Sequence, residues 1–159
     1  MMFLKFIFAM FLGFLPGIVG LIFAPIETGQ NAWYSTLVSS SLTPDGWMFS
    51  MMWAVLYFFM GIALFMIMQT TDHSNRHDKT SAYTLFTINI LLNMLWTYSF
   101  FGLHLPEAAL IVLTALIIVV LFMAKAYLRI SKGAFWLTVP YLLWLMFAFY
   151  LNGMIIYLN

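Results

Sequence analysis

Residues 107–129 read EAALIVLTALIIVVLFMAKAYLR, and Thr114 is the only polar residue between Glu107 and Lys125. A helix needs about 20 such residues to cross a hydrocarbon layer of about 30 Å. Spanning β-strands would be about 10 residues long and would alternate apolar with polar side chains, which this run does not do. Because backbone groups in lipid must be hydrogen-bonded within their own segment, the run predicts a transmembrane helix. We assign this helix no chemistry.

Four further apolar runs of this kind occupy residues 6–25, 47–69, 81–103 and 134–157. The whole chain is 65% hydrophobic and 7% charged, whereas soluble domains average about 45–50% apolar and about 25% charged residues. The apolar part of the first run is longer than the core of a typical signal peptide, so we expect it to remain as a helix. The sequence therefore predicts an all-α membrane protein, a five-transmembrane-helix bundle forming a single domain over residues 1–159.

The basic residues predict how the bundle is oriented. With five spans, the N-terminus and the loops after the second and fourth spans share one side of the membrane. Every Lys and Arg lies on or near that side, and cytoplasmic loops are enriched in these residues. We therefore expect a cytoplasmic N-terminus and an outside C-terminus, and the net charge of +1 gives no reason to expect a nucleic-acid partner. The basic residues are Lys5, Arg76, Lys79, Lys125, Arg129 and Lys132.

Two other features concern packing and access. Gly13 and Gly17 have the spacing that allows two membrane helices to approach closely, and packing within one chain is a simpler interpretation than a dimer face. The loop 26–46 is longer than usual for a compact bundle and contains Trp33 and Tyr34. We expect some order there, such as a short interfacial helix. It would serve either as a lid over an interior site or as an aromatic anchor at the membrane surface.

Polar residues within the third span line one helical face. Asn89, Asn93, Trp96 and Phe100 follow one another at steps of four, three and four, and Asn152 lies in the last span. A carboxamide exposed to lipid would leave its donors unpaired, so these amides should point inward. They would be either interhelical hydrogen-bonding groups or polar anchors in an aromatic-lined pocket. The chain contains 6 Trp, 8 Tyr and 17 Phe, which favours the pocket.

The chain lacks the residues that several classes of reaction and transport require. The sequence has no Ser/His/Asp set and no paired carboxylates or charges near the centre of a span, which ion-coupled transport would need. His73 and His77 stand four residues apart, a spacing that permits metal binding. A solvated turn of mixed charge is the simpler interpretation, so we expect no metal site.

At its aromatic positions the chain resembles the TspO/MBR family of tryptophan-rich sensory and translocator proteins. Three motifs carry the resemblance, and they occur in the family's order from the first loop to the last span. They are Trp33-Tyr34 followed by Pro44, Trp47, Phe49, Trp53, Tyr57 and Gly61; Asn89-x3-Asn93-x2-Trp96 with Phe100-Phe101; and Pro140-Tyr141-x2-Trp144-x3-Ala148-x2-Leu151-Asn152. Two departures, Ser39-Ser40-Ser41-Leu42 and Pro44-Asp45, suggest a looser lid than in the family.

The resemblance implies a homodimer in a bacterial cytoplasmic membrane, with a ligand pocket beneath the first loop. It implies porphyrins such as protoporphyrin IX and haem as ligands rather than permanently bound cofactors, and isoquinoline or benzodiazepine drugs as further ligands. Some members are associated with light-dependent porphyrin degradation, for which the matching residues are Trp53 and Trp144. The ligand-binding residues it implies are Trp33, Tyr34, Pro44, Trp47, Phe49, Trp53, Tyr57, Asn89, Asn93, Trp96, Phe100, Trp144, Phe147, Ala148 and Leu151.

Three functions are compatible with these observations. The leading hypothesis is a tetrapyrrole-binding receptor or carrier with a regulatory or stress role. The second is a light-dependent porphyrin-degrading enzyme that uses the pocket tryptophans. The third is a structural membrane scaffold whose amides only join the helices.

Overall fold

The computed structural model describes residues 2–23, 32–70 and 76–159. Its helices are α1 (Met2–Phe23), α2 (Ala32–Thr36), α3 (Gly46–Gln69), α4 (Arg76–Thr97), α5 (Pro106–Ile130) and α6 (Lys132–Leu158). One π-helical turn, η2 (Tyr98–Gly102), continues α4. Five segments of the described chain are long and apolar enough to cross a membrane. The prediction of an all-α bundle with five membrane helices is therefore confirmed.

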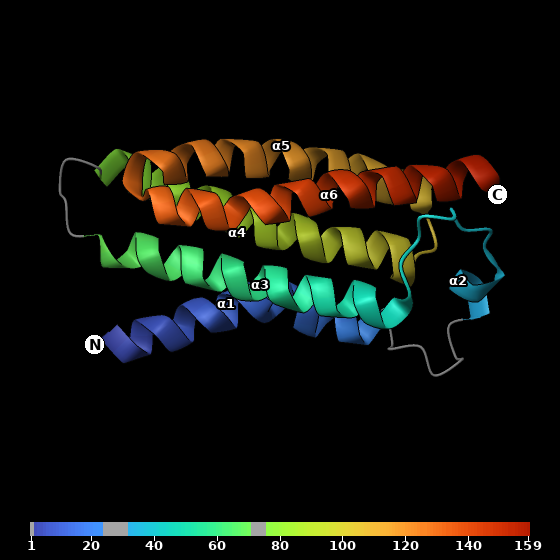
Figure 1. Cartoon of the computed structure of the whole chain (residues 1–159), viewed down its shortest axis with the longest axis horizontal. Coiled ribbons are helices and arrows are strands. Elements are labelled where there is room, and N and C mark those ends of the chain that lie inside the picture. Colours follow the sequence, from blue (N-terminus) through green and yellow to red (C-terminus); the bar gives the residue numbers. More distant parts are fainter. Residues whose placement is uncertain (1, 24–31, 71–75) are drawn as a thin grey trace.

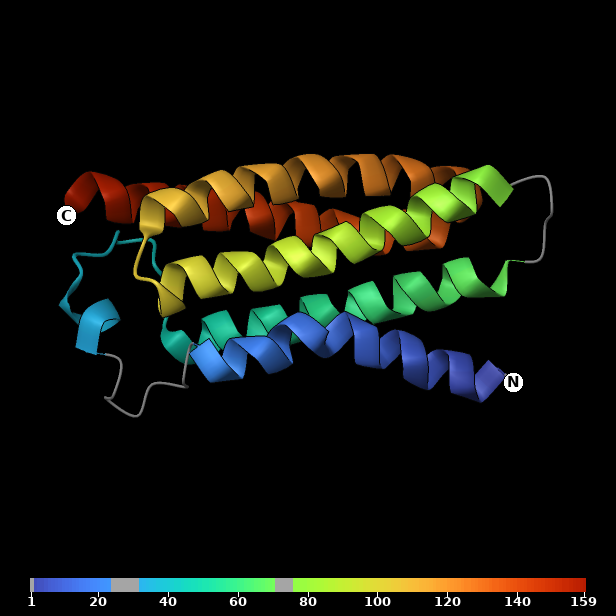
Figure 2. The same cartoon turned by 180° about the vertical axis from the view of Figure 1, so that it is seen from behind.

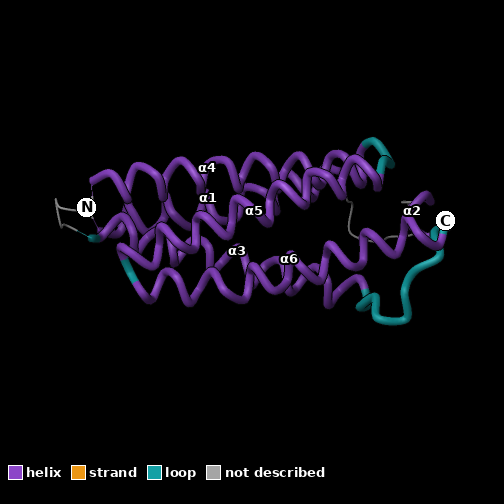
Figure 3. The backbone as a smooth tube through the Cα atoms, turned by 90° about the horizontal axis from the view of Figure 1, so that it is seen from above, coloured by secondary structure: helices purple, strands orange, loops and turns teal. Residues whose placement is uncertain are grey.

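The five long helices lie side by side along one axis, and the marked N- and C-terminal ends lie at opposite ends of the bundle (Figures 1 and 2). The short helix α2 is set apart, at the end of the bundle where α6 finishes (Figure 3). All five membrane helices begin earlier than predicted: α3 and α5 by one residue, and α1, α4 and α6 by two to five, at Met2, Arg76 and Lys132. The extension of α4 adds the polar residues 76–80, because helical hydrogen bonding does not require an apolar sequence.

Neighbours in the bundle do not follow chain order. Helix α1 packs on α3 and α4, α6 packs on α3 and α5, and α4 packs on α5. Going round the bundle, the order is therefore α1, α3, α6, α5, α4. Helices α3 and α4 follow one another in the chain but contact each other little. This arrangement leaves α3, α4 and α6 facing a common interior.

Glycine allows α1 to lie directly against α3. A Cβ atom added to Gly13 would lie 2.7 Å from the carbonyl oxygen of Tyr57 and 2.8 Å from the amide nitrogen of Gly61. At Gly17 it would lie 3.0 Å from the Tyr57 ring. Both glycines therefore pack within the chain, as the sequence predicted. The contact also holds Tyr57 in place at the start of the interior described next.

Candidate functional site

A chain of hydrogen bonds crosses the middle of the bundle and joins α3, α4 and α6. The Tyr57 hydroxyl donates to Asn93 Oδ1 at 2.9 Å, and Asn93 Nδ2 donates to the Tyr141 hydroxyl at 2.8 Å. The Tyr141 hydroxyl in turn donates to Asn89 Oδ1 at 2.8 Å. All four side chains are buried, with Asn93 and Tyr141 each only 1% exposed. We call Tyr57, Asn89, Asn93 and Tyr141 the central network.

The central network shows which groups the two amides of α4 contact. Both point inward, as predicted. Asn93 is bonded to the hydroxyls of Tyr57 and Tyr141, and Asn89 is bonded to that of Tyr141. A buried amide without partners would be costly, whereas a bonded one joins the helices. The structure thus gives Asn89 and Asn93 the interhelical role. From the sequence, the amides could be either interhelical hydrogen-bonding groups or polar anchors of a pocket. Their tyrosine partners could not be identified from spacing along one helix.

Asn152 makes a second polar bridge, nearer the end of the bundle where α6 finishes. Its Oδ1 accepts a hydrogen bond from Trp96 Nε1 at 3.3 Å, and its Nδ2 donates to the carbonyl oxygen of Pro106 at 2.9 Å. Asn152 is 2% exposed, so this amide also points inward as expected. The bridge fixes the Trp96 ring and ties α6 to the start of α5.

Aromatic rings fill the interior between the central network and α2. Trp53 lies at the centre of this group, with its ring centroid 5.4 Å from Tyr57, 5.9 Å from Trp96 and 6.4 Å from Trp144. These separations are typical of attractive aromatic pairs. The other rings join through Trp96 and Trp144: Phe100 lies 5.6 Å from Trp96, while Phe49 and Phe147 lie 5.8 Å and 5.5 Å from Trp144. We call Phe49, Trp53, Trp96, Phe100, Trp144 and Phe147 the aromatic cluster.

Trp144 and Trp96 differ in how their indole N–H groups are satisfied. The Trp144 Nε1 atom is buried and has no hydrogen-bond partner among the described residues. Trp96 Nε1, by contrast, is bonded to Asn152. An indole N–H placed in apolar surroundings normally finds an acceptor, because leaving it without one is unfavourable. The cluster therefore contains one hydrogen-bond donor that a bound molecule could satisfy.

Helix α2 and the segment that follows cover the outer end of the cluster. The Trp33 ring stacks on His104 at 4.4 Å with an interplanar angle of 11°, and its edge packs on Phe100 at 5.5 Å. Tyr34 packs on Phe100 and Phe101 at 6.1 Å and 5.8 Å. The expected short helix is therefore present, in contact with the aromatic cluster. The predicted lid also includes residues 26–31, which lie outside the described residues.

The segment after α2 is fastened to α6. The backbone N–H of Val38 donates to Asn159 Oδ1 at 2.9 Å, and Asn159 Nδ2 donates to the Val38 carbonyl oxygen at 3.1 Å. The hydroxyls of Ser40 and Tyr150 are hydrogen-bonded at 3.1 Å. These bonds hold the covering segment at the end of the bundle through the side chains of Tyr150 and Asn159.

The remaining predicted site residues differ in how far they are exposed. Ala148 and Leu151 are buried on α6, at 3% and 7% exposure, and Pro44 is half-buried ahead of α3. Trp47 is 64% exposed and stands outside the cluster. No motif in the sequence indicated a role for His104. Its φ of 56° places the backbone after η2 in the left-handed region. Its stacking on Trp33 depends on that turn, which no pattern in the sequence indicated.

The described residues contain no group of three or more His, Cys, Asp or Glu side chains that could hold a metal ion. His73, one member of the spaced histidine pair, lies outside the described residues.

Membrane-spanning helices around an interior of indoles, phenols and amides define the class of molecule: an integral membrane protein with five helices and an aromatic-lined interior. The chain belongs to the TspO/MBR family, whose sequence profile matches residues 8–158. The resemblance seen in the motifs is thereby confirmed.

Individual relatives agree with this assignment. The chain is 38% identical to the tryptophan-rich protein TspO of Chlorobaculum tepidum, with 90% of this chain and 88% of that protein covered. It is 34% identical to the tryptophan-rich protein TspO of Archaeoglobus fulgidus, with 81% of each covered. It is 30% identical to the translocator protein of Bos taurus, with 87% of this chain and 82% of that protein covered.

Proposed function

We propose that the chain is a tetrapyrrole-binding receptor or carrier, with protoporphyrin IX or haem bound at the aromatic cluster. The observation that carries the proposal is the buried Trp144 Nε1 without a partner, amid stacked and edge-packed rings. A flat conjugated ligand can stack on such rings. A porphyrin also carries carboxylates, which accept hydrogen bonds well and would satisfy the indole donor.

Binding at the cluster requires rings to move apart, since the rings are in contact with one another. The covering segment is held by ring contacts and a few side-chain hydrogen bonds rather than by helix packing. Such local contacts open at lower free energy than the core of a bundle. We propose that α2 and residues 37–43 lift to admit the ligand and then close over it.

The wider proposal places this end of the molecule outside the cell. The basic residues lie toward the other end of the bundle, which the positive-inside tendency would put in the cytoplasm of a bacterium. The ligand would then enter from the extracytoplasmic side. The homodimer and the drug-type ligands implied by the family belong to the same proposal.

Titration of tryptophan emission with protoporphyrin IX tests the binding proposal. The purified chain in detergent should show saturable quenching, stronger than in an unrelated tryptophan-rich membrane protein. Trp144→Phe keeps most of the ring and removes the donor. It should weaken binding up to about tenfold, the value of one hydrogen bond. It should change the unfolding temperature little, because the smaller ring loses some packing on Phe49, Trp53 and Phe147 but also removes an unsatisfied donor.

Trp136→Phe is the matched control, because Trp136 lies on the same helix but is 67% exposed. This variant should bind as the parent does, although it also loses one emitter. Non-saturable quenching in the parent would refute the proposal. Equal weakening by the two variants would show that the cluster is not the binding site.

Light-dependent porphyrin degradation remains the second candidate, favoured by one observation. Trp53 and Trp144 belong to one cluster with centroids 6.4 Å apart, so a porphyrin stacked there would have two oxidisable indoles beside it. Under light, the Trp53→Phe, Trp144→Phe double variant should still bind porphyrin but consume it more slowly than the parent. The enzyme hypothesis fails if the parent bleaches porphyrin no faster than free tryptophan does.

A further inference from the structure

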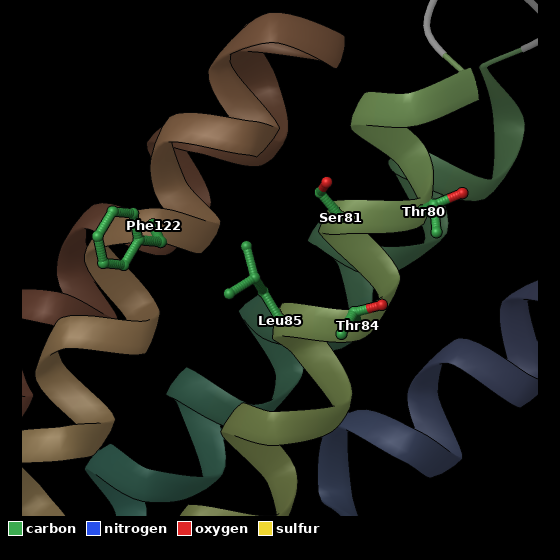
Figure 4. Close-up of a pocket in the computed structure, with 5 residues that line it drawn as sticks. All are labelled: Thr80, Ser81, Thr84, Leu85 and Phe122. Carbon is green, nitrogen blue, oxygen red and sulfur yellow. The ribbon is translucent and has the colours of Figure 1, made fainter.

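A groove of about 340 Å³ lies between α4 and α5, away from the aromatic cluster, and is lined by Thr80, Ser81, Thr84, Leu85 and Phe122. Figure 4 shows Ser81 and Leu85 on the flank of α4 that faces α5, whereas Thr80 and Thr84 extend from its other flank. Phe122 is 58% exposed. The groove is therefore on the outer surface of the bundle, where the surroundings of a membrane helix are lipid.

The groove is apolar at Leu85 and Phe122. About two helical turns from these residues, toward the start of α4 and the end of α5, charged side chains form its rim. Arg129 Nη1 lies 3.2 Å from Asp78 Oδ1, which fixes the level of α5 against α4. Phe122 and Leu85 each lie seven residues from that pair along their own helices. With a rise of 1.5 Å per residue, they stand opposite one another, about 10 Å from the ion pair. Lys125, exposed and three residues after Phe122, lies on the same face between the two levels.

The charged rim carries a surplus of positive charge. Arg129 makes a single contact with Asp78 and its side chain is 59% exposed, so other guanidinium donors remain available. Lys125 adds a second cation against the single carboxylate of Asp78. The neighbouring Lys79 donates instead to the carbonyl oxygen of Thr70, which occupies it at the end of α3.

We propose that this groove binds an anionic phospholipid from the leaflet at the basic end of the bundle. One acyl chain lies along Leu85 and Phe122, and the phosphodiester contacts Arg129 and Lys125. The distance of about 10 Å between these levels suffices to cross from headgroups into hydrocarbon, since each interfacial region is roughly 5–8 Å thick. Each basic residue should favour an anionic over a zwitterionic headgroup by about fivefold.

The test compares two lipids that differ only in headgroup charge. The unfolding temperature of the purified full chain is measured in mixed micelles with phosphatidylglycerol and with phosphatidylcholine of identical acyl chains. Phosphatidylglycerol should raise it more. The Lys125→Gln, Arg129→Gln double variant should lose at least half of that difference, whereas Asp78→Asn should increase it by removing the opposing carboxylate.

Lys5→Gln with Lys132→Gln is the matched control, because it removes the same charge from the same end of the bundle at α1 and α6. It should keep the difference between the two lipids. Equal stabilisation of the parent by both lipids would overturn the proposal. A control double variant that loses as much as the groove double variant would do so too, since diffuse attraction would then explain the effect. The comparison within each variant cancels any change in intrinsic stability.

Discussion

The central network and the aromatic cluster both consist of side chains that point into the bundle. They differ in whether their polar atoms have hydrogen-bond partners. In the central network each amide oxygen and each tyrosine hydroxyl makes at least one hydrogen bond within the chain. In the aromatic cluster Trp144 Nε1 has none among the described residues. A hydrogen-bonded network stabilises the fold, whereas an unsatisfied buried donor is a cost that a ligand can remove. The comparison separates structural polar residues from candidate binding residues.

The largest effect should come from Asn93→Leu, which breaks two hydrogen bonds at once. The Tyr57 hydroxyl loses its acceptor and remains buried, so the free energy of unfolding should fall by about 2–4 kcal/mol. Porphyrin affinity should change less than about threefold, well under the tenfold expected for Trp144→Phe. Denaturant unfolding in micelles and emission quenching measure the two quantities.

Thr114→Val serves as the control for Asn93→Leu, because the Thr114 hydroxyl bonds only to Leu110 of its own helix and is exposed. It should change stability by no more than about 0.5 kcal/mol. If Asn93→Leu abolished porphyrin binding without lowering the free energy of unfolding, the central network would be part of the binding site. The distinction between structural and binding residues would then be wrong.

A smaller effect should distinguish the two tyrosines of the network. Tyr141 makes two hydrogen bonds through its hydroxyl, and Tyr57 makes one. With each bond worth about 1 kcal/mol, Tyr141→Phe should destabilise by about 2 kcal/mol and Tyr57→Phe by about half as much. The same unfolding measurement applies to both. The reverse order would show that the bonds do not act as independent contributions.

The smallest effect concerns the segment that covers the aromatic cluster. Asp45 has φ −56° and ψ 146° and makes no capping hydrogen bond through its side chain, so its backbone suits proline. Asp45→Pro should reduce the freedom of the open segment by about 0.4–1 kcal/mol and slow porphyrin dissociation up to about fivefold. Stopped-flow quenching measures the rate.

Trp33→Ala should have the opposite effect to Asp45→Pro, because it loosens the segment that covers the aromatic cluster. It removes the stack on His104 and should speed dissociation more than it slows association, because most affinity changes within one complex lie in the off-rate. Unchanged dissociation in both variants would make α2 an interfacial anchor rather than a lid.

Composition and spacing were sufficient for the five spans, the inward amides, the short helix in the first loop and the Gly13 contact. They could not identify the partners of the amides. Tyr57 and Tyr141 lie 36 and 48 residues from Asn93 in the chain, on helices whose rotation the sequence does not fix. In a soluble helix the apolar stripe indicates the buried face. Here lipid and interior are both apolar, so the sequence could not show that Trp47 is exposed while Trp144 packs in the aromatic cluster.

The order of helices around the bundle has a consequence for biosynthesis. Asn89 and Asn93 emerge within the third span, but one of their partners, Tyr141, belongs to the fifth span, α6. A nascent chain with four inserted spans would therefore hold two incompletely bonded amides within the bilayer, where such groups are unfavourable. Release from that state comes only when α6 inserts between α3 and α5. Insertion of α6, rather than of any earlier helix, thus commits the bundle to its final form.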